Sequence, residues 1–267
     1  MTELRHARET YELRGLIFQA HNELKAGWSE EVYHQALHSL LRDNEVPVAS
    51  NPRKSIFHRE HEIHTFECDL IVWDRIILEL KALPSTTFTA AHYAQIFSYL
   101  KCWSKDLGLL VNFGVSHADI KRVVWNEQTL AICENYDSLK SELTQSDRTC
   151  LRRIRRDLLA VAKQYGLGYP ETVYRKIVAV EMQYNGLDCQ CNVDVPAKWD
   201  GKILTRHASD HLLVENKYLV SVCALLEQPA KYEFIRTKTF LNHLGLRFGL
   251  VVNFGKKQFQ IYGVNPE

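Results

Sequence analysis

The stretch Cys68–Leu83, CDLIVWDRIILELKAL, is apolar at both odd and even positions over most of its length. A strand that is buried on both faces has this pattern, because the side chains of neighbouring residues point to opposite faces. The stretch nevertheless carries Glu79 and Lys81, which are two residues apart and therefore share one face. It predicts a buried central strand with an acid and a base side by side.

The composition is that of a globular protein with a substantial core. The chain has 267 residues, of which 46% are hydrophobic and 24% are charged. No apolar run reaches the length of a membrane span, and the first residues lack the apolar segment of a secretory signal. The seven cysteines have no paired metal-ligand spacing, so we expect reduced thiols in a cytoplasmic protein.

The sequence contains a tandem duplication, because several motifs recur at a constant separation of 141 residues. The recurring motifs are GWSEEVY at 27–33 with GYPETVY at 168–174, GLLVNFG at 108–114 with GLVVNFG at 249–255, and Asp69 with Asp210. We therefore expect two domains, residues 1–145 and residues 146–267, joined near the polar stretch Ser141–Thr149.

Each copy is expected to contain the same order of helices and strands. Apolar periodicity and helix-start signals predict helices at Tyr11–Leu24, Glu30–Asn44 and Ala90–Trp103. The expected strands are Ser55–His58, His61–Val72, Arg75–Ala82, Leu107–Gly114 and Ile120–Trp125. This order predicts an α/β fold with a mixed central sheet flanked by helices, and the second copy repeats it.

Three polar residues of the first copy form a candidate site. Asp69 lies on the strand before Glu79 and Lys81, and a tight turn between the two strands would bring the three side chains together. Two carboxylates at short range repel each other unless a divalent cation lies between them, and oxygen ligands suit Mg²⁺ or Mn²⁺. The backbone carbonyl of Leu80 is a further candidate ligand. A lysine beside the metal can orient or activate a water and offset charge on a phosphate.

The alternative is that Glu79 and Lys81 form a solvated pair on an exposed face of the sheet. The two-sided apolar run around them and the nearby Asp69 favour the metal site instead.

A resemblance to a known family rests on five motifs in order. These are HNELKAGWSEEVY at 21–33, Asp69, ELK at 79–81, HYAQIFSYLK at 92–101 and LLVNFG at 109–114. Together they resemble the GxxExxY proteins of the PD-(D/E)XK nuclease superfamily over about Leu13–Trp125, with Gly27, Glu30 and Tyr33 as the signature. One departure is Lys25-Ala26, where a Gly-Pro is common; it affects a loop and leaves the chemistry in place.

The resemblance implies two tandem restriction-endonuclease-like domains and a Mg²⁺- or Mn²⁺-dependent nuclease that acts on nucleic acid, on DNA more than on RNA. It implies Asp69, Glu79 and Lys81 as the metal-and-water site, with Glu30 as an additional acid and Gln95 as a glutamine near the site. From the residues alone, Glu30 also suits the first turn of a helix, where an acid interacts favourably with the helix dipole.

The second copy lacks the acid and the lysine. Its corresponding strand contains LVSVCAL at 219–225. Aligned on the Ala-Leu ending, the strand places Ser221 and Cys223 at the two positions; aligned without a gap, it places Val220 and Val222 there. In both alignments the pair is absent, so we expect a second domain that does not hydrolyse a substrate.

The two halves of the chain differ in charge. Residues 1–150 carry 16 Lys and Arg against 21 Asp and Glu, whereas residues 151–267 carry 17 against 11. The basic half opens with a cluster formed by Arg152, Arg153, Arg155 and Arg156. One hypothesis is that these arginines bind nucleic-acid phosphates while the first copy cuts. The other is that they pair with the acidic first copy in an intramolecular pseudodimer.

The leading functional hypothesis is a metal-dependent nuclease with one active site in the first copy. The alternative is a non-catalytic nucleic-acid-binding or scaffolding protein, since one copy has already lost the acid and the lysine. A third hypothesis is a partner-binding module that contacts no nucleic acid. Binding without cleavage would favour the second hypothesis, and the absence of both would favour the third.

Overall fold

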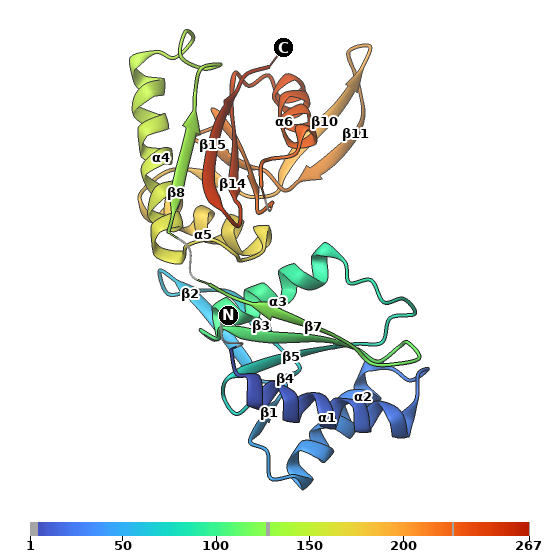
Figure 1. Cartoon of the computed structure of the whole chain (residues 1–267). Helices are drawn as coiled ribbons and strands as arrows, with labels where there is room; N and C mark the ends of the chain where they lie inside the picture. Colours follow the sequence, from blue (N-terminus) through green and yellow to red (C-terminus); the bar gives the residue numbers. More distant parts are fainter. Residues whose placement is uncertain (1–4, 127–128, 226, 267) are drawn as a thin grey trace. The chain divides into compact units, whose positions relative to one another are not determined.

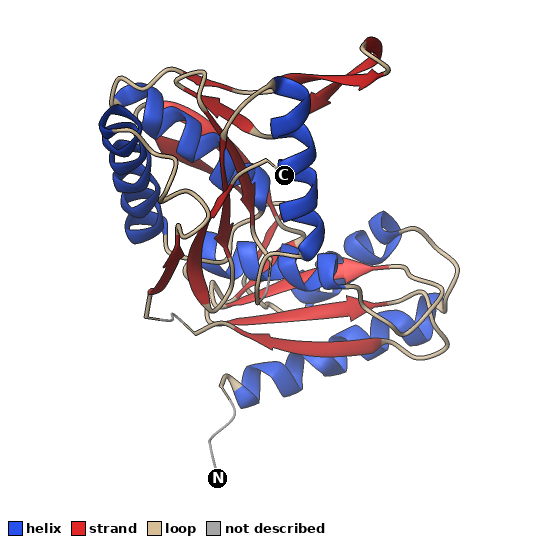
Figure 2. Cartoon of the chain, turned by 90° about the horizontal axis from the view of Figure 1, so that it is seen from above, coloured by secondary structure: helices blue, strands red, loops and turns tan. Residues whose placement is uncertain are grey.

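The computed structural model describes residues 5–126, 129–225 and 227–266. Its helices and strands form two compact units, each with its own sheet and helices (Figures 1 and 2). The first unit comprises residues 1–55 and 65–127, and the second comprises residues 56–64 and 128–267.

The first copy contains three helices and a mixed sheet in the described residues. Its elements are α1 (Ala7–Leu24), α2 (Glu30–Asp43), β1 (Val48–Ser50), β2 (Arg53–His58), β3 (His61–Glu67), β4 (Leu70–Val72), β5 (Ile76–Lys81), α3 (Ala90–Cys102), β6 (Leu107–Asn112) and β7 (Asp119–Val124). The sheet order is β1-β4-β5-β6-β7, with β5 and β6 parallel and the other neighbours antiparallel. The predicted mixed α/β architecture is confirmed.

Helices α1 and α2 cover one face of this sheet. Leu13 and Leu37 from these helices form one apolar cluster with Leu78 and Leu80 of β5. Because side chains alternate along a strand, the intervening Glu79 points to the opposite face, on the side of α3. Glu79 and Lys81 of β5 therefore lie on the face of the sheet that α1 and α2 leave uncovered.

The predicted single strand His61–Val72 is wrong in one respect, since the chain divides it into β3 and β4. Strand β3 pairs only with β2 in a separate two-stranded sheet, whereas β4 pairs with β5 in the main sheet. The chain must bend between the two pairings, and it does so at Cys68 and Asp69. Asp69 therefore lies at a bend beside the sheet and outside the regular strands.

The second copy repeats this architecture. Its elements are α4 (Gln145–Tyr165), α5 (Glu171–Tyr184), β9 (Cys189–Gln190), β10 (Val193–Trp199), β11 (Lys202–Ser209), β12 (Leu212–Val214), β13 (Tyr218–Cys223), α6 (Lys231–Leu244), β14 (Phe248–Phe254) and β15 (Gln258–Val264). The sheet order is β8-β15-β14-β13-β12-β9, with β13 and β14 parallel.

The second sheet begins with β8 (Ala131–Asn135), which precedes the expected boundary between residues 145 and 146. Strand β8 pairs in parallel with β15 at the edge of this sheet, so the compact units do not separate at that boundary. A second departure is residues 56–64, the tip of the β2–β3 hairpin, which belong to the second unit. There His58 is buried, with its Nε2 3.0 Å from Oε2 of Glu181.

Candidate active site

The acid and the lysine of β5 form a buried ion pair. Only 2% of Glu79 is exposed, and Nζ of Lys81 lies 2.7 Å from its Oε1. Burying a carboxylate is costly unless it is paired and hydrogen-bonded, and the ammonium of Lys81 supplies that partner. The exposed, solvated arrangement considered for this pair is therefore not what the structure shows.

Glu30 approaches the same lysine from α2. Its Oε2 lies 3.7 Å from Nζ of Lys81, and its Oε1 accepts a hydrogen bond of 3.3 Å from the backbone N–H of Ala82. The two carboxylates thus contact the lysine from two elements. Glu30 is the first residue of its helix and remains about half exposed, so it closes the outer side of the pair.

Asp69 reaches the site through the backbone of β5. Its Oδ2 accepts a hydrogen bond of 2.6 Å from the N–H of Leu80. The pairing of β4 with β5 ends at Leu70 and Leu78, so beyond that point the edge of β5 faces no strand. The bend at Asp69 places a carboxylate at this edge, where it meets the N–H of Leu80, two residues past Leu78.

Burial and mutual repulsion act on both acids. Burial raises the pKa of Asp69, although the hydrogen bond from Leu80 opposes the shift. Burial and then the charge of Asp69 raise the pKa of Glu79 to about 7, against the charge of Lys81. Burial by itself would lower the pKa of Lys81, but the charge of Glu79 and its hydrogen bond raise it overall. The lysine therefore stays protonated at neutral pH.

The two acids fit a hard divalent cation. The second carboxylate oxygen of Glu79, Oε2, is buried and has no hydrogen-bond partner among the residues that the structure describes. An acceptor in that state suits a cation, and Mg²⁺ commonly binds one or two carboxylates and keeps several waters. Within the described ranges, no three His, Cys, Asp or Glu side chains already form a metal-ligand group. The fit therefore rests on Asp69 and Glu79.

Gln95 lies on α3 and contacts another residue of that helix, Tyr99. Its Nε2 donates a hydrogen bond of 2.9 Å to the hydroxyl of Tyr99, one helical turn further along α3. Tyr99 is buried, and burial followed by the charge of Glu79 raises the pKa of its hydroxyl. Tyr99 was not predicted from the sequence, although its position four residues after Gln95 places both on one face of the helix.

His34 is a second residue of the site that was not predicted from the sequence. Its side chain is buried, and its Nε2 donates to the backbone carbonyl of Asp69 at 3.1 Å, with Oγ of Ser50 3.3 Å away. The histidine thus ties α2 to the bend that carries the aspartate. Its position one turn after Glu30 was the available signal, since residues four apart share a helix face.

Tyr33 of the signature holds the loop before α2. Its hydroxyl donates to the carbonyl of Lys25 at 2.7 Å and accepts from the N–H of Trp28 at 3.3 Å, while its ring stacks on Phe113. Gly27 in this loop has φ of +118°, a conformation that favours glycine. The loop that leads to Glu30 is thereby fixed by a core residue.

Three of the four arginines of α4 have partners within the second unit. Arg155 forms two hydrogen bonds of 2.6 Å with the carboxylate of Glu134. Arg153 donates to the carbonyls that follow α5, and Arg156 contacts the neighbouring Asp157. Arg152 is exposed.

The β10–β11 hairpin of the second copy contains one extra residue, which the constant offset of 141 did not predict. Left-handed turn residues at 59–60 correspond to 200–201 with an offset of 141, but those at 73–74 correspond to 215–216 with an offset of 142. The register of β10 and β11 shifts between Ala197 and Lys198, leaving Leu204 without a partner. A β-bulge of this kind adds one residue to one strand.

The bulge changes which residue corresponds to Asp69. Leu70 pairs with Leu78 in the first copy, and Leu212 pairs with Val220 in the second. The residue before Leu212 is His211, so the match of Asp69 with Asp210 is corrected by one position.

The strand register also decides between the two alignments of the β5 pair. Glu79 lies opposite Leu110 in the first copy, and Ser221 lies opposite Val251, the residue that matches Leu110, in the second. By the same register Lys81 corresponds to Cys223. The alignment on the Ala-Leu ending is confirmed, and the second copy holds none of the three chemical groups at the corresponding positions.

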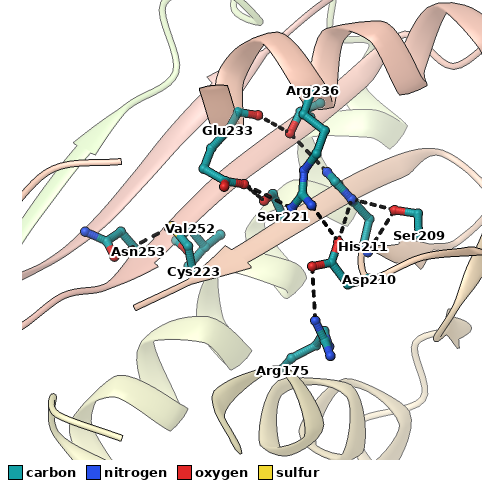
Figure 3. Close-up of polar contacts among 11 residues, drawn as sticks. Arg175, Ser209, Asp210, His211, Ser221, Cys223, Glu233, Arg236, Val252 and Asn253 are labelled. Atoms are coloured by element: carbon teal, nitrogen blue, oxygen red, sulfur yellow. Dashed lines mark hydrogen bonds and ion pairs between the residues drawn. The ribbon is translucent and has the colours of Figure 1, made fainter. Parts of the chain in front are cut away.

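Two arginines pair with Asp210 in the second copy (Figure 3). Arg236, which corresponds to Gln95, lies 3.1 Å from Oδ1 of Asp210, and Arg175, which corresponds to His34, lies 3.4 Å from Oδ2. A hydrogen bond from His211 and the charge of Arg236 lower the pKa of Asp210. Protein cations surround this carboxylate, so it offers a metal ion little net charge.

Comparison with known proteins gives one family. A family model described as the PD-(D/E)XK nuclease superfamily matches residues 7–123 and again residues 148–262. No protein in the curated set matches the sequence. A crystal structure of SSO0001 aligns with 46% of this chain and 61% of its own chain, at 19% identity and a TM-score of 0.31; this chain thus spans less than two thirds of that protein. No helix among the described residues is long and apolar enough to cross a membrane.

Proposed function

The chain belongs to the PD-(D/E)XK nuclease superfamily, and from this premise we propose that it hydrolyses phosphodiester bonds of nucleic acid at a single site in the first copy. The observation that carries the proposal is the buried pair of Glu79 and Lys81 beside Asp69, with one carboxylate oxygen lacking a partner among the described residues. We expect DNA as the substrate, and the spacing of Gly27, Glu30 and Tyr33 supports the GxxExxY family.

Asp69 and Glu79 would hold the metal, Mg²⁺ or Mn²⁺, with the backbone carbonyl of Leu80 as a further ligand. A bound divalent cation supplies Lewis-acid polarisation of the phosphate and lowers the pKa of a bound water. The hydrogen bond from Leu80 orients the carboxylate of Asp69, and His34 fixes the bend from which it extends. The acids are therefore positioned before any metal binds.

Lys81 would act as a fixed positive charge. Its raised pKa keeps the ammonium protonated, so it can orient a water by hydrogen bonding and offset the charge that develops on the phosphate. Glu30 would assist by holding the ammonium from the exposed side. Gln95 would support the site through Tyr99, whose hydroxyl lies in the field of both acids.

The second copy would be non-catalytic and would hold the substrate. Ser221 and Cys223 offer neither a second carboxylate nor an ammonium. The alternative function is non-catalytic nucleic-acid binding or scaffolding by the whole chain, and the loss of these groups in one copy favours it. Arg152 is one of the four arginines on α4 expected to bind nucleic acid. It is exposed, and it lies one helical turn before Arg156.

Cleavage of labelled single- and double-stranded DNA and RNA with Mg²⁺ and with Mn²⁺ tests the proposal. We expect Lys81→Ala to lower the rate at least about 100-fold, because the charge beside the phosphate is lost. The matched control is Cys223→Ala, at the corresponding position of the second copy, which should retain full activity. Equal activity of Lys81→Ala and wild type would refute the assignment, and binding without cleavage would select the alternative.

A further inference from the structure

The hairpin formed by β10 and β11 exposes large apolar side chains. The exposed fraction is 73% for Trp199, 50% for Ile203 and 68% for Leu204. The hairpin, whose strands are labelled β10 and β11 in Figure 1, extends beyond the sheet of the second unit. Apolar side chains gathered on an exposed projection mark an interaction surface.

Lysines alternate with these apolar side chains at the hairpin tip, residues 198–204. Trp199 lies directly opposite Lys202, and Lys198 lies directly opposite Ile203. Directly opposed residues share one face of a hairpin, so each face of the tip carries one apolar side chain and one ammonium. All four side chains are exposed, and so is the bulged Leu204 that follows them.

In the first copy, the tip of the corresponding hairpin contacts another residue of the same chain. The turn residues 59–60 match the turn residues 200–201 in their left-handed backbone. In the first hairpin, however, His58 is buried and Arg59 donates to Oε2 of Glu181 at 2.9 Å. The tip of the β2–β3 hairpin thus contacts Glu181, whereas the tip of the matching β10–β11 hairpin is exposed.

We propose that the tip of the β10–β11 hairpin binds single-stranded nucleic acid, with the indole of Trp199 stacked on an unpaired base and Lys198 and Lys202 near the flanking phosphates. Aromatic stacking combined with positive charge is the usual recognition of single strands. This inference rests on the proposed function, and it names the part of the second copy that holds the substrate.

The chemistry of the tip favours a nucleic acid with unpaired bases. In a duplex the bases are stacked on one another, so an exposed ring gains no base face, whereas an unpaired base offers one to Trp199. The arginines of α4 are weaker candidates because Arg153, Arg155 and Arg156 already have partners. Lys202 is exposed on the same face of the hairpin as the ring of Trp199, and Lys198 is exposed on the other face.

The test is the affinity of the full chain for a labelled oligothymidylate, measured by fluorescence anisotropy in EDTA so that no cleavage occurs. Trp199→Ala should weaken binding roughly 5- to 150-fold, and Trp199→Phe should retain most of the affinity. The double variant Lys198→Ala with Lys202→Ala should reduce the slope of log affinity against log salt by about 1.4. Tyr11→Ala, an exposed aromatic on α1, is the matched control and should bind as wild type does.

Three outcomes would overturn the inference. The first is unchanged affinity in Trp199→Ala while wild type both binds and cleaves, which leaves the nuclease proposal intact. The second is an equal loss of affinity for duplex and single strand, which excludes stacking. The third is a change in oligomeric state by light scattering without a change in binding, which identifies a protein-binding surface. Wild type that neither binds nor cleaves would instead refute the nuclease function itself.

Discussion

At the scale of single residues, burying the carboxylate of Glu79 costs folding free energy, and the fold does not require a carboxylate there. In the second copy the same strand position is occupied by Ser221, which is equally buried and donates to Glu233 at 3.1 Å. Both strands fit their sheets, one with an ion pair and one with a neutral hydroxyl. The charge at Glu79 is therefore best explained by chemistry.

The free energy of unfolding should depend on pH because Glu79 titrates differently in the folded and unfolded chain. The pKa of Glu79 is about 7 in the folded chain against 4.5 for an ordinary glutamate. Between these values the folded state keeps a proton that the unfolded state releases, so the free energy of unfolding falls as pH rises. Glu79→Gln cannot ionise, and its stability relative to wild type should increase by about 3 kcal/mol from pH 4.5 to pH 8.

Urea unfolding in EDTA across this pH range measures the difference, with the exposed Glu31→Gln as control. If the free energies of unfolding of wild type and Glu79→Gln change with pH in parallel, burial does not destabilise the ionised carboxylate.

Tyr99 is expected to position the site. Tyr99→Phe removes the hydroxyl that accepts from Gln95, while the ring keeps its packing; Phe240 occupies the matching position in the second copy. We expect a loss of about 1 kcal/mol in the free energy of unfolding and a decrease of about tenfold in kcat with KM unchanged, since the residue acts through its neighbours. Steady-state cleavage rates check this, with Tyr93→Phe on the same helix as control; a changed KM alone would argue against the role.

At the scale of elements, the end of β6 supports the strand that carries the site. Oδ1 of Asn112 accepts from the N–H groups of Leu83 and Gly114, and its Nδ2 donates to the carbonyl of Ser85. The second copy repeats this brace between Asn253 and Leu225. The brace belongs to the fold, because it persists where the acid and the lysine are absent.

A glycine next to this brace gives a matched pair of substitutions. A Cβ at Gly114 would clash with the carbonyl oxygen of Leu83, and a Cβ at Gly255 would approach that of Leu225 to 2.6 Å. Each substitution by alanine should cost about 1–3 kcal/mol in stability. Only Gly114→Ala should also lower cleavage, because it displaces the segment after Lys81.

Thermal unfolding and cleavage assays separate the two effects. Gly15→Ala is the control, because nothing lies within 4 Å of its Cβ inside α1. That variant should be slightly more stable, by about 0.5–1 kcal/mol. Equal losses of activity in Gly114→Ala and Gly255→Ala would contradict a single site.

The elements that periodicity predicts are those with a strong apolar pattern. Strand β6 is buried along its whole length, β5 is buried at all but its last residue, and α2 has an apolar face, so the sequence identifies them. Strand β8 lies at a sheet edge and is half exposed, with no alternation that distinguishes it from a loop. The break after β3 depends on which strand each half pairs with, which is information that a local pattern does not contain.

At the scale of the whole molecule, the duplication serves as an internal comparison. The sequence alone predicts two copies, a mixed sheet in each and the loss of the acid and the lysine in the second. It does not predict the change of offset, because an inserted residue in a hairpin alters no motif. It also suggests that Arg155 is available to a ligand, whereas the structure pairs it with Glu134 on β8, an element that periodicity missed.

The chain should bind one divalent cation with the two acids of the first copy. Titration with Mn²⁺, followed by calorimetry or electron paramagnetic resonance, should give one site per chain. Asp69→Asn and Glu79→Gln should each weaken binding at least about tenfold, because one charged oxygen ligand is lost. Ser221→Ala, the matched change in the second copy, should bind as wild type does, and a second site of equal affinity would show that the second copy is intact.

The bulge at Leu204 has a consequence for the history of the second copy. Replacing Ser221, Cys223 and Arg236 by Glu, Lys and Gln would restore three side chains, yet the carboxylate of Asp210 would still lie one residue away from the required position. Restoration would also need a deletion in the hairpin or a new aspartate at His211, which is fully buried. Because of the inserted residue, substitutions at those three positions alone should not restore a metal site in the second copy.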